Sequence, residues 1–306
     1  MPAERLRWGA GGRRNSCGNN HPHGWALGNQ IFQYALGRAL EFRGQEVQFD
    51  TRLVRKGCGR IYLLDKLGLR PKIGFPDTPG IPTIAEGSLR FNPKILDVKT
   101  DCILYGYWQC EKYFEDIRGV LLKEIFDHTT PGFRTSNVAR EIYAYGARSC
   151  FVHIRRTDNL RPAGLTVHGL LNDPANKYYE RAIQMVREKV PGAHFFVFSD
   201  DPEWIREKFS RPDFTTVTHN LMSGYLTERL DIADREGGTE HEDLWLMSLC
   251  HHAIIANSTF SWWGAWLNPA ELVTPRVILT PKPWFNSTEL DSTDIIPERW
   301  IKVPIR

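Results

Sequence analysis

The sequence predicts an α/β protein with two Rossmann-like domains, the second of them a doubly wound parallel sheet. Short apolar runs typical of buried strands alternate with helical patterns through the second half of the chain. Polar and charged residues follow several of these runs directly, where the carboxyl ends of parallel strands would meet. The length of 306 residues also exceeds that of a typical single domain.

The first half of the chain has fewer clear patterns. Apolar residues recur at helical spacing from Ile31 to Leu40, and Gly44 follows as a stop signal. The segment 58–93 is rich in glycine and proline and is predicted to be irregular, apart from one short helix near 63–67. The other patterns predict strands at 47–49 and 102–108, and helices at 113–126 and 138–145.

The second half alternates regularly between strand and helix. Strands are predicted at 150–154, 194–198, 215–218, 253–256 and 277–279, with helices at 178–189, 202–209 and 242–251. This order requires crossover connections, which favour a parallel sheet. We place the domain boundary near 146–149.

Composition excludes several classes of function. The net charge of +3 is too small for a nucleic-acid or membrane surface, and no apolar run is long enough to span a bilayer. The six cysteines are scattered without a Cys-x-x-Cys pair, which indicates buried free thiols in a reducing compartment. Residues 1–24 have neither the apolar core of a signal peptide nor a strand pattern and are predicted to be a disordered or atypical tail.

Three polar clusters follow predicted strands at one edge of the sheet. They contain Arg155, Arg156 and Asp158 after the first strand, 199–201 after the second, and 257–261 after the fourth. A guanidinium fork matches phosphate oxygens in a bidentate way. The three clusters therefore predict a crevice for a nucleotide-type ligand.

Each cluster also has a structural interpretation. Asp201 precedes Pro202 and is interpreted as a helix cap. For Asp200, a structural role and a ligand-binding role are equally favoured. Ser258 and Thr259 could cap a helix, but a helix start with hydroxyl groups also binds anions, and we favour the ligand. The histidines show no spacing typical of a metal site, and paired arginines offer a metal-free way to neutralise a diphosphate.

Five blocks of the chain resemble the alpha-1,2-fucosyltransferase family of bacterial type. The blocks are 24–40, with a Gly-x-x-Leu-Gly-Asn-Gln signature, His153–Asp158, with a His-x-Arg-Arg-x-Asp motif, and then 198–204, 242–268 and 281–285. The chain departs from the family pattern at Trp25, where the signature has glycine, and at Thr157, where bacterial relatives often have glycine.

The resemblance implies an inverting, metal-independent glycosyltransferase without a cofactor. It would move L-fucose from GDP-fucose to the 2-hydroxyl of a galactose-terminated oligosaccharide, on a GT-B-like fold. An acceptor-side domain would span 25–147 and a donor domain 148–306. A cytoplasmic location is expected, with peripheral association at the inner membrane left open. The implied donor-site residues are His153, Arg155, Arg156, Ser199, Asp200, Asn257, Ser258, Thr259 and Ser261, and the N-terminal signature loop contains Gly28, Asn29 and Gln30.

Catalysis would need a base for the acceptor hydroxyl and cations for the leaving diphosphate. Arg155 and Arg156 are predicted to stabilise the leaving group, and Asp158 is the predicted base, with a salt bridge to one of these arginines as the equal alternative. Two other functions stay open at this point. One is an alpha-1,6-fucosyltransferase acting on N-acetylglucosamine-containing oligosaccharides. The other is a non-catalytic nucleotide- or glycan-binding relative with a damaged first domain.

Overall fold

The chain forms two compact units. The computed structural model describes residues 26–51, 62–74, 80–127, 136–156, 171, 176–218, 240–272, 274–287 and 289–305. Unit 1 comprises residues 1–128 and 293–297, and unit 2 comprises residues 129–292 and 298–306. The tail predicted at 1–24 lies outside the described residues. The domains predicted at 25–147 and 148–306 stay a prediction.

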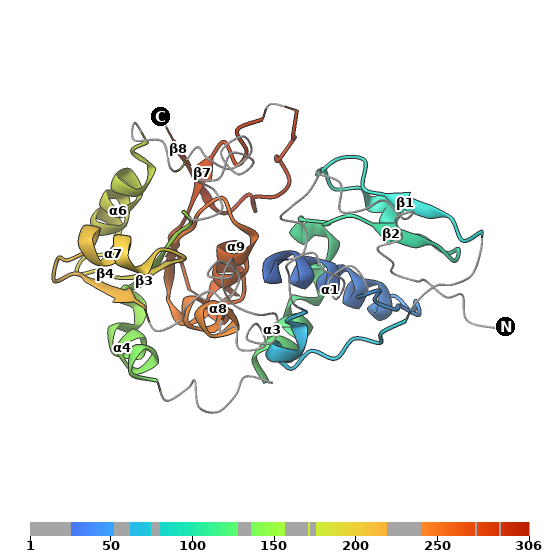
Figure 1. Ribbon diagram of the computed structural model, residues 1–306, viewed down its shortest axis with the longest axis horizontal. Coiled ribbons are helices and arrows are strands. Elements are labelled where there is room, and N and C mark those ends of the chain that lie inside the picture. Colours follow the sequence, from blue (N-terminus) through green and yellow to red (C-terminus); the bar gives the residue numbers. More distant parts are fainter. Residues whose placement is uncertain are drawn as a thin grey trace, which may run out of the picture. The chain divides into compact units, whose positions relative to one another are not determined.

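Unit 1 is built around one buried helix and a small parallel sheet (Figure 1). Its helices are α1 (Leu27–Phe42) and α3 (Arg118–Asp127), and its two strands are β1 (Thr83–Ala85) and β2 (Ile103–Tyr105). Single 3-10 turns connect them: η1 (Leu64–Leu67), η2 (Pro93–Ile95), η3 (Glu111–Tyr113) and η4 (Glu115–Ile117). The helix predicted from the 31–40 pattern is confirmed as α1.

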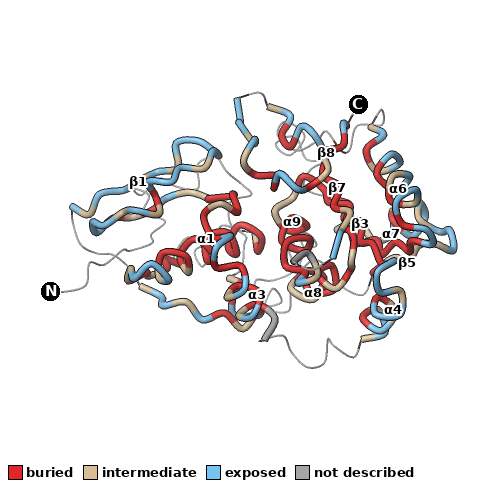
Figure 2. Tube along the Cα trace, turned by 180° about the vertical axis from the view of Figure 1, so that it is seen from behind, coloured by how far each residue is buried: buried red, intermediate tan, exposed pale blue. Residues whose placement is uncertain are grey.

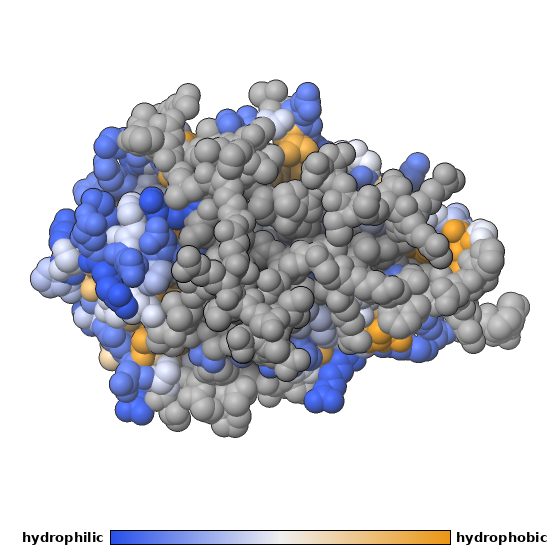
Figure 3. Space-filling model, in the orientation of Figure 1, coloured by the Kyte–Doolittle hydropathy of each residue, from blue (hydrophilic) through white to orange (hydrophobic). Residues whose placement is uncertain are grey.

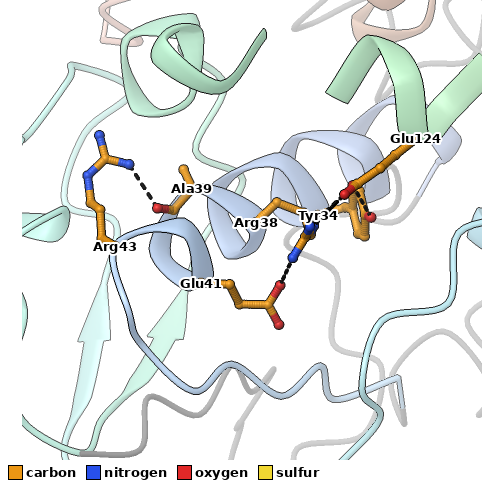
Figure 4. Close-up of polar contacts among 6 residues, drawn as sticks. All are labelled: Tyr34, Arg38, Ala39, Glu41, Arg43 and Glu124. Carbon is orange, nitrogen blue, oxygen red and sulfur yellow. Dashed lines mark hydrogen bonds and ion pairs between the residues drawn. The ribbon is translucent and has the colours of Figure 1, made fainter. Parts of the chain in front are cut away.

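Helix α1 is attached to α3 by a partly buried polar network (Figure 4). The Tyr34 hydroxyl donates to Glu124 Oε2 at 2.7 Å, and Arg38 Nη2 lies 2.5 Å from Glu124 Oε1. Arg38 also pairs with Glu41 on its own helix. Burial and the Glu124 carboxylate raise the pKa of Tyr34, so its hydroxyl stays protonated and keeps donating.

Two predictions for the first half are wrong. The alternation of Val47 and Phe49 gives no strand in the described residues, only an isolated bridge from Phe49 to Ile73. Strand β1 lies in the segment that was predicted to be irregular. Thr83 and Ala85 are exposed and only Ile84 is partly buried, so the strand lacks the apolar run that identifies a buried strand.

Unit 2 contains a six-stranded, entirely parallel sheet in the order β5-β4-β3-β6-β7-β8. Its strands are β3 (Ser149–Ile154), β4 (His194–Ser199), β5 (Phe214–Val217), β6 (His252–Ile254), β7 (Ile278–Lys282) and β8 (Ile301–Pro304). Its helices are α4 (Asn137–Tyr145), α6 (Tyr178–Lys189), α7 (Pro202–Lys208), α8 (Glu240–Leu249) and α9 (Thr259–Trp266), with 3-10 turns η6 (Gly146–Arg148) and η9 (Pro269–Leu272).

Helices cover both faces of this sheet, and the twofold alternation of β3 separates the two cores. Cys150 and Val152 share a core with Val186 of α6. The next residue along, His153, packs its ring against Phe260 of α9, with centroids 5.7 Å apart. All six residues of β3 are buried, as the burial-coloured trace shows (Figure 2). Burial on both faces explains why this strand reads as a continuous apolar run.

The outer surface of unit 2 is hydrophilic on the face drawn in Figure 3, over α6 and α7. The exposed residues of these two helices include Glu188 and Lys189 of α6 and Glu203 of α7. Within the described part of the chain, no helix is long and apolar enough to cross a membrane. Strand β8 was not predicted, because Lys302 and Pro304 interrupt its apolar residues at the edge of the sheet.

Candidate functional site

The strand order of unit 2 places a topological switch point between β3 and β6. From β3 the chain moves outward to β4 and β5, and it returns to β6 before moving the other way to β7 and β8. In open parallel sheets, ligands bind outside the carboxyl ends of the strands at such a point. The predicted donor residues lie at or directly after the carboxyl ends of β3, β4 and β6: His153, Arg155, Arg156, Ser199, Asp200, Asn257, Ser258, Thr259 and Ser261.

Arg156 is held by three different contacts at this edge. Its Cζ lies 4.1 Å from the ring centroid of Trp204, and its Nε donates to Asp201 Oδ2 at 3.0 Å. Its backbone N–H donates to Asp200 Oδ1 at 2.8 Å. Among the described residues, neither terminal nitrogen of Arg156 has a hydrogen-bond partner. The guanidinium is therefore positioned on one side while two N–H₂ groups remain to bind an anion.

Asp201 has two roles, one of which the sequence predicted. Its Oδ1 accepts a hydrogen bond from the backbone N–H of Trp204 at 3.1 Å, which confirms it as the cap of α7. Its Oδ2 holds Arg156. The backbone N–H of Asp201 itself donates to Ser199 Oγ at 3.0 Å. Ser199 and Asp201 thus fix the turn that brings Trp204 beneath the arginine.

The other wall of the edge is the turn from β6 into α9. Asn257 is buried, and its Nδ2 donates to the carbonyl of Trp284 at 3.1 Å. Ser261 is also buried, and its hydroxyl donates to the carbonyl of Ser258 at 3.3 Å. Ser258 occupies the N-cap position of α9 without a side-chain cap hydrogen bond, and both Ser258 and Thr259 are half-buried. The two buried residues support the turn, whereas the two half-buried ones lie where a ligand could reach them.

Two adjacent tyrosines of α6 support this edge from below. The Tyr179 hydroxyl donates to the carbonyl of His153 at 3.0 Å, and the Tyr178 hydroxyl lies 2.6 Å from the carbonyl of Ile255 and 2.9 Å from that of Leu279. Burial raises the pKa of both phenols, so they stay protonated as donors. Helix α6 thereby holds the backbone at the carboxyl end of β3 and the backbone that follows β6.

The N-terminal signature residues lie in unit 1, in the first turn of α1. Gly28, Asn29 and Gln30 are all buried. Gln30 Oε1 accepts from the backbone N–H of Leu63 at 2.9 Å, and Asn29 Oδ1 accepts from Gln109 Nε2 at 2.9 Å. Both amide side chains therefore connect α1 to loops of unit 1. Their predicted role facing a ligand stays a prediction.

Several predicted features fall outside the described residues, among them Asp158, the proposed base, and Thr157. Trp204 was missed, because an indole 48 positions after Arg156 gives no spacing signal for a stacked pair. In the described ranges no group of three or more His, Cys, Asp or Glu residues could hold a metal ion. Metal independence stays a prediction.

Comparison with known proteins agrees with this architecture. The sequence model of glycosyl transferase family 11 matches residues 94–303, which is more than two thirds of the chain. The chain belongs to this family. It is therefore a glycosyltransferase, and the matched segment contains all of the unit 2 sheet except Pro304, the last residue of β8.

Individual relatives of this family 11 member act in related transfers. An alpha-1,2-colitosyltransferase of Escherichia coli is 32% identical over 90% of this chain and 96% of its own length. The O-antigen biosynthesis glycosyltransferase WbnK of Escherichia coli is 28% identical over 68% of this chain and 63% of its own. The galactoside 2-alpha-L-fucosyltransferase Sec1 of Mus musculus is 25% identical over 65% of this chain and 50% of its own.

Proposed function

We propose that this family 11 enzyme transfers L-fucose from GDP-fucose to the 2-hydroxyl of a galactose-terminated glycan, with inversion and without a metal. The observation that carries the proposal is Arg156, held between Trp204 and Asp201 at the switch point with two N–H₂ groups left for an anion. The names of the mouse Sec1 enzyme and of the colitosyltransferase support a 2-linked product. A GT-B arrangement of the two units and a cytoplasmic location stay parts of the proposal.

The proposed step is a single displacement at the anomeric carbon. The acceptor oxygen forms a bond to that carbon while the bond to the diphosphate oxygen breaks, and its electron pair leaves with GDP. Arg156, together with Arg155, would bind the negative charge that grows on the diphosphate. Charge-assisted hydrogen bonds of this kind contribute about 1.5–3 kcal/mol each.

A second donor is favoured by a specific observation. A relative that matches 90% of the chain is a colitosyltransferase, and colitose differs from L-fucose only by the absence of the 3-hydroxyl. A site that hydrogen-bonds the 3-hydroxyl would reject the deoxy sugar, because its polar groups would be left unpaired. A site that packs apolar groups there would accept both sugars. L-fucose stays the proposed donor sugar, and its 3-deoxy form is the second candidate.

One assay tests this function. The purified chain is incubated with GDP-fucose or GDP-colitose and a panel of galactose- and N-acetylglucosamine-terminated acceptors, and the product linkage is read by NMR. We expect an alpha-1,2 link to galactose from at least one donor. An alpha-1,6 link to N-acetylglucosamine would replace this proposal with the alternative linkage. Binding of GDP by calorimetry without turnover of either donor would remove the proposed transfer.

A further inference from the structure

A carboxylate in unit 1 lies at the edge of its small parallel sheet, outside the site described in unit 2. Glu86 directly follows β1, and its backbone N–H donates to the carbonyl of Tyr105, the last residue of β2, at 2.8 Å. Because β1 and β2 are parallel, Glu86 and the loop from Gly106 to Gln109 share the carboxyl edge of the sheet. The half-buried Glu86 side chain lies against that loop.

Both oxygens of Glu86 are held by backbone donors. Oε2 accepts from the N–H of Tyr107 at 2.7 Å, and Oε1 accepts from the N–H of Trp108 at 3.1 Å. An ionised carboxylate offers about four acceptor positions, so each oxygen keeps one for a further partner. The two backbone hydrogen bonds therefore orient the carboxylate but do not use all of its acceptor positions.

The loop that holds Glu86 is specially shaped. A Cβ atom at Gly106 would lie 2.5 Å from Glu86 Cβ and 2.7 Å from Oε2, so only glycine permits this close approach. Trp108 has a φ of 58°, the one positive φ of a non-glycine residue in the described ranges. Strained backbone of this kind gathers at active sites and ligand clamps. The indole Nε1 of Trp108 is buried and has no hydrogen-bond partner among the described residues.

The electrostatics of Glu86 are unusual for a structural carboxylate. Within the described part of the chain it has no Lys, Arg or His partner, and burial raises its pKa to about 6 although two N–H donors lower it. The titratable groups that interact with its charge are the phenols of Tyr107 and Tyr113, and burial raises the pKa of each to about 12. Both phenols stay neutral near pH 7, so Glu86 is the group that titrates there.

The Glu86 edge is connected to the N-terminal signature of the chain. Gln33 Nε2 donates to the carbonyl of Gly106 at 3.0 Å, and Gln109 Nε2 donates to Asn29 Oδ1 at 2.9 Å. The loop is therefore fixed at both ends to the first two turns of α1. A half-buried carboxylate that is held by two backbone donors and has no cationic partner in the described residues fits the requirements of a proton acceptor.

We propose that Glu86 is the catalytic base and that the Gly106–Gln109 edge of unit 1 binds the acceptor sugar. This inference rests on the proposed function, and of the two roles predicted for Asp158 from the sequence it leaves the salt bridge to one of the arginines. The acceptor hydroxyl gives its proton to Glu86, and the oxygen lone pair forms the new bond to the anomeric carbon. The electron pair of the broken bond leaves on GDP, and Glu86 afterwards releases the proton to water.

The test compares pH–rate profiles of wild type and Glu86→Gln between pH 4.5 and 9. Wild-type kcat/KM is expected to fall about tenfold per pH unit below pH 6, the pKa of Glu86. Glu86→Gln is expected to lose about 10²- to 10⁴-fold in kcat and to lose this acidic limb, with GDP affinity unchanged. Asp158→Asn is expected to weaken GDP binding and keep the limb.

A matched control is Asp294→Asn in the same unit. The Asp294 carboxylate also accepts a backbone hydrogen bond, from Phe91 at 3.0 Å, but it is paired with Lys112 at 2.9 Å. This variant is expected to melt lower and to keep the acidic limb. A Glu86→Gln protein with wild-type kcat would overturn the inference while the transferase function stands. If Glu86→Gln does not fold, the pH–rate profile of wild type alone tests the inference. A wild-type kcat/KM that shows no acidic limb between pH 5.5 and 6.5 would also overturn it.

Discussion

Replacing Arg156 by alanine separates its binding role from its structural role, because unit 2 contains a second cluster of the same chemistry. Arg187 pairs with Asp213 at 2.5 Å, and its Cζ lies 5.5 Å from the ring of Phe195 and 5.6 Å from that of Phe214. Phe195 and Phe214 are at the amino ends of their strands. Arg187 therefore lies at the opposite edge of the sheet from the switch point.

The structural costs of the two substitutions should be similar. The side chains of Arg156 and Asp201 are 21% and 28% exposed, and those of Arg187 and Asp213 are both 29% exposed. Ion pairs this accessible are worth at most about 1 kcal/mol, and a stacked guanidinium adds about 0.5–1 kcal/mol. Each variant is expected to lose about 1–2 kcal/mol of unfolding free energy, which lowers Tm by a few degrees.

Ligand affinity should separate the two variants. Arg156→Ala removes a charge-assisted contact worth about 1.5–3 kcal/mol, so the Kd for GDP rises about 10- to 150-fold. Arg187→Ala is expected to leave that Kd unchanged. Calorimetric titration with GDP, together with thermal unfolding of both variants, measures the two effects. Equal Kd values for Arg156→Ala and wild type would refute the assignment of Arg156 to the diphosphate.

Two further predictions concern stability. Gly264→Ala would place a Cβ 2.8 Å from Met247 Cβ in the contact of α9 with α8 and should destabilise by about 1–3 kcal/mol. Gly119→Ala, in α3, would place a Cβ with nothing within 4 Å of it and should stabilise the fold by up to about 1 kcal/mol. Urea titration measures the free energy of unfolding of both variants, and a change of the same sign in both would contradict this prediction. His252 accepts from Val277 N–H at Nδ1, and burial lowers its pKa to about 4, so the unfolded chain binds more protons between pH 6.5 and 4. Stability should therefore fall by about 2–3 kcal/mol as pH drops through this window, a slope that His252→Gln should flatten.

The central strands of unit 2, β3, β4 and β6, could be predicted because every residue in them is buried. Helix α6 was predicted with the bounds it has, and β3 begins one residue before its predicted start. A strand covered by helices on both sides must be apolar throughout, which leaves a signal in the sequence alone. Strand β1 has no such cover, and its pairing with β2 depends on residues about twenty positions away. Local pattern therefore carried no information about it.

The candidate site likewise contains features that the sequence predicted and features that it did not. The position of Arg156 followed from the end of a buried strand, and the cap at Asp201 followed from the proline after it. The second bond of Asp201 and the ring of Trp204 depend on how β3 and β4 pair in register, because Ile154 lies opposite Ser199. One residue of slip would move each side chain to the other face of its strand. Sequence patterns thus indicate which groups end a strand, but only the sheet shows which of them meet.

The carboxyl edges of the two sheets use opposite electrostatics, and the difference bears on their proposed roles. At the switch point a guanidinium cation is held by a carboxylate and an indole. At the unit 1 edge Glu86 is held by N–H dipoles without a cation, and burial brings its pKa to about 6. A permanent charge suits binding of a permanent anion, whereas a group that titrates near neutrality suits proton transfer. The two proposals accordingly assign leaving-group stabilisation to Arg156 and activation of the acceptor to Glu86.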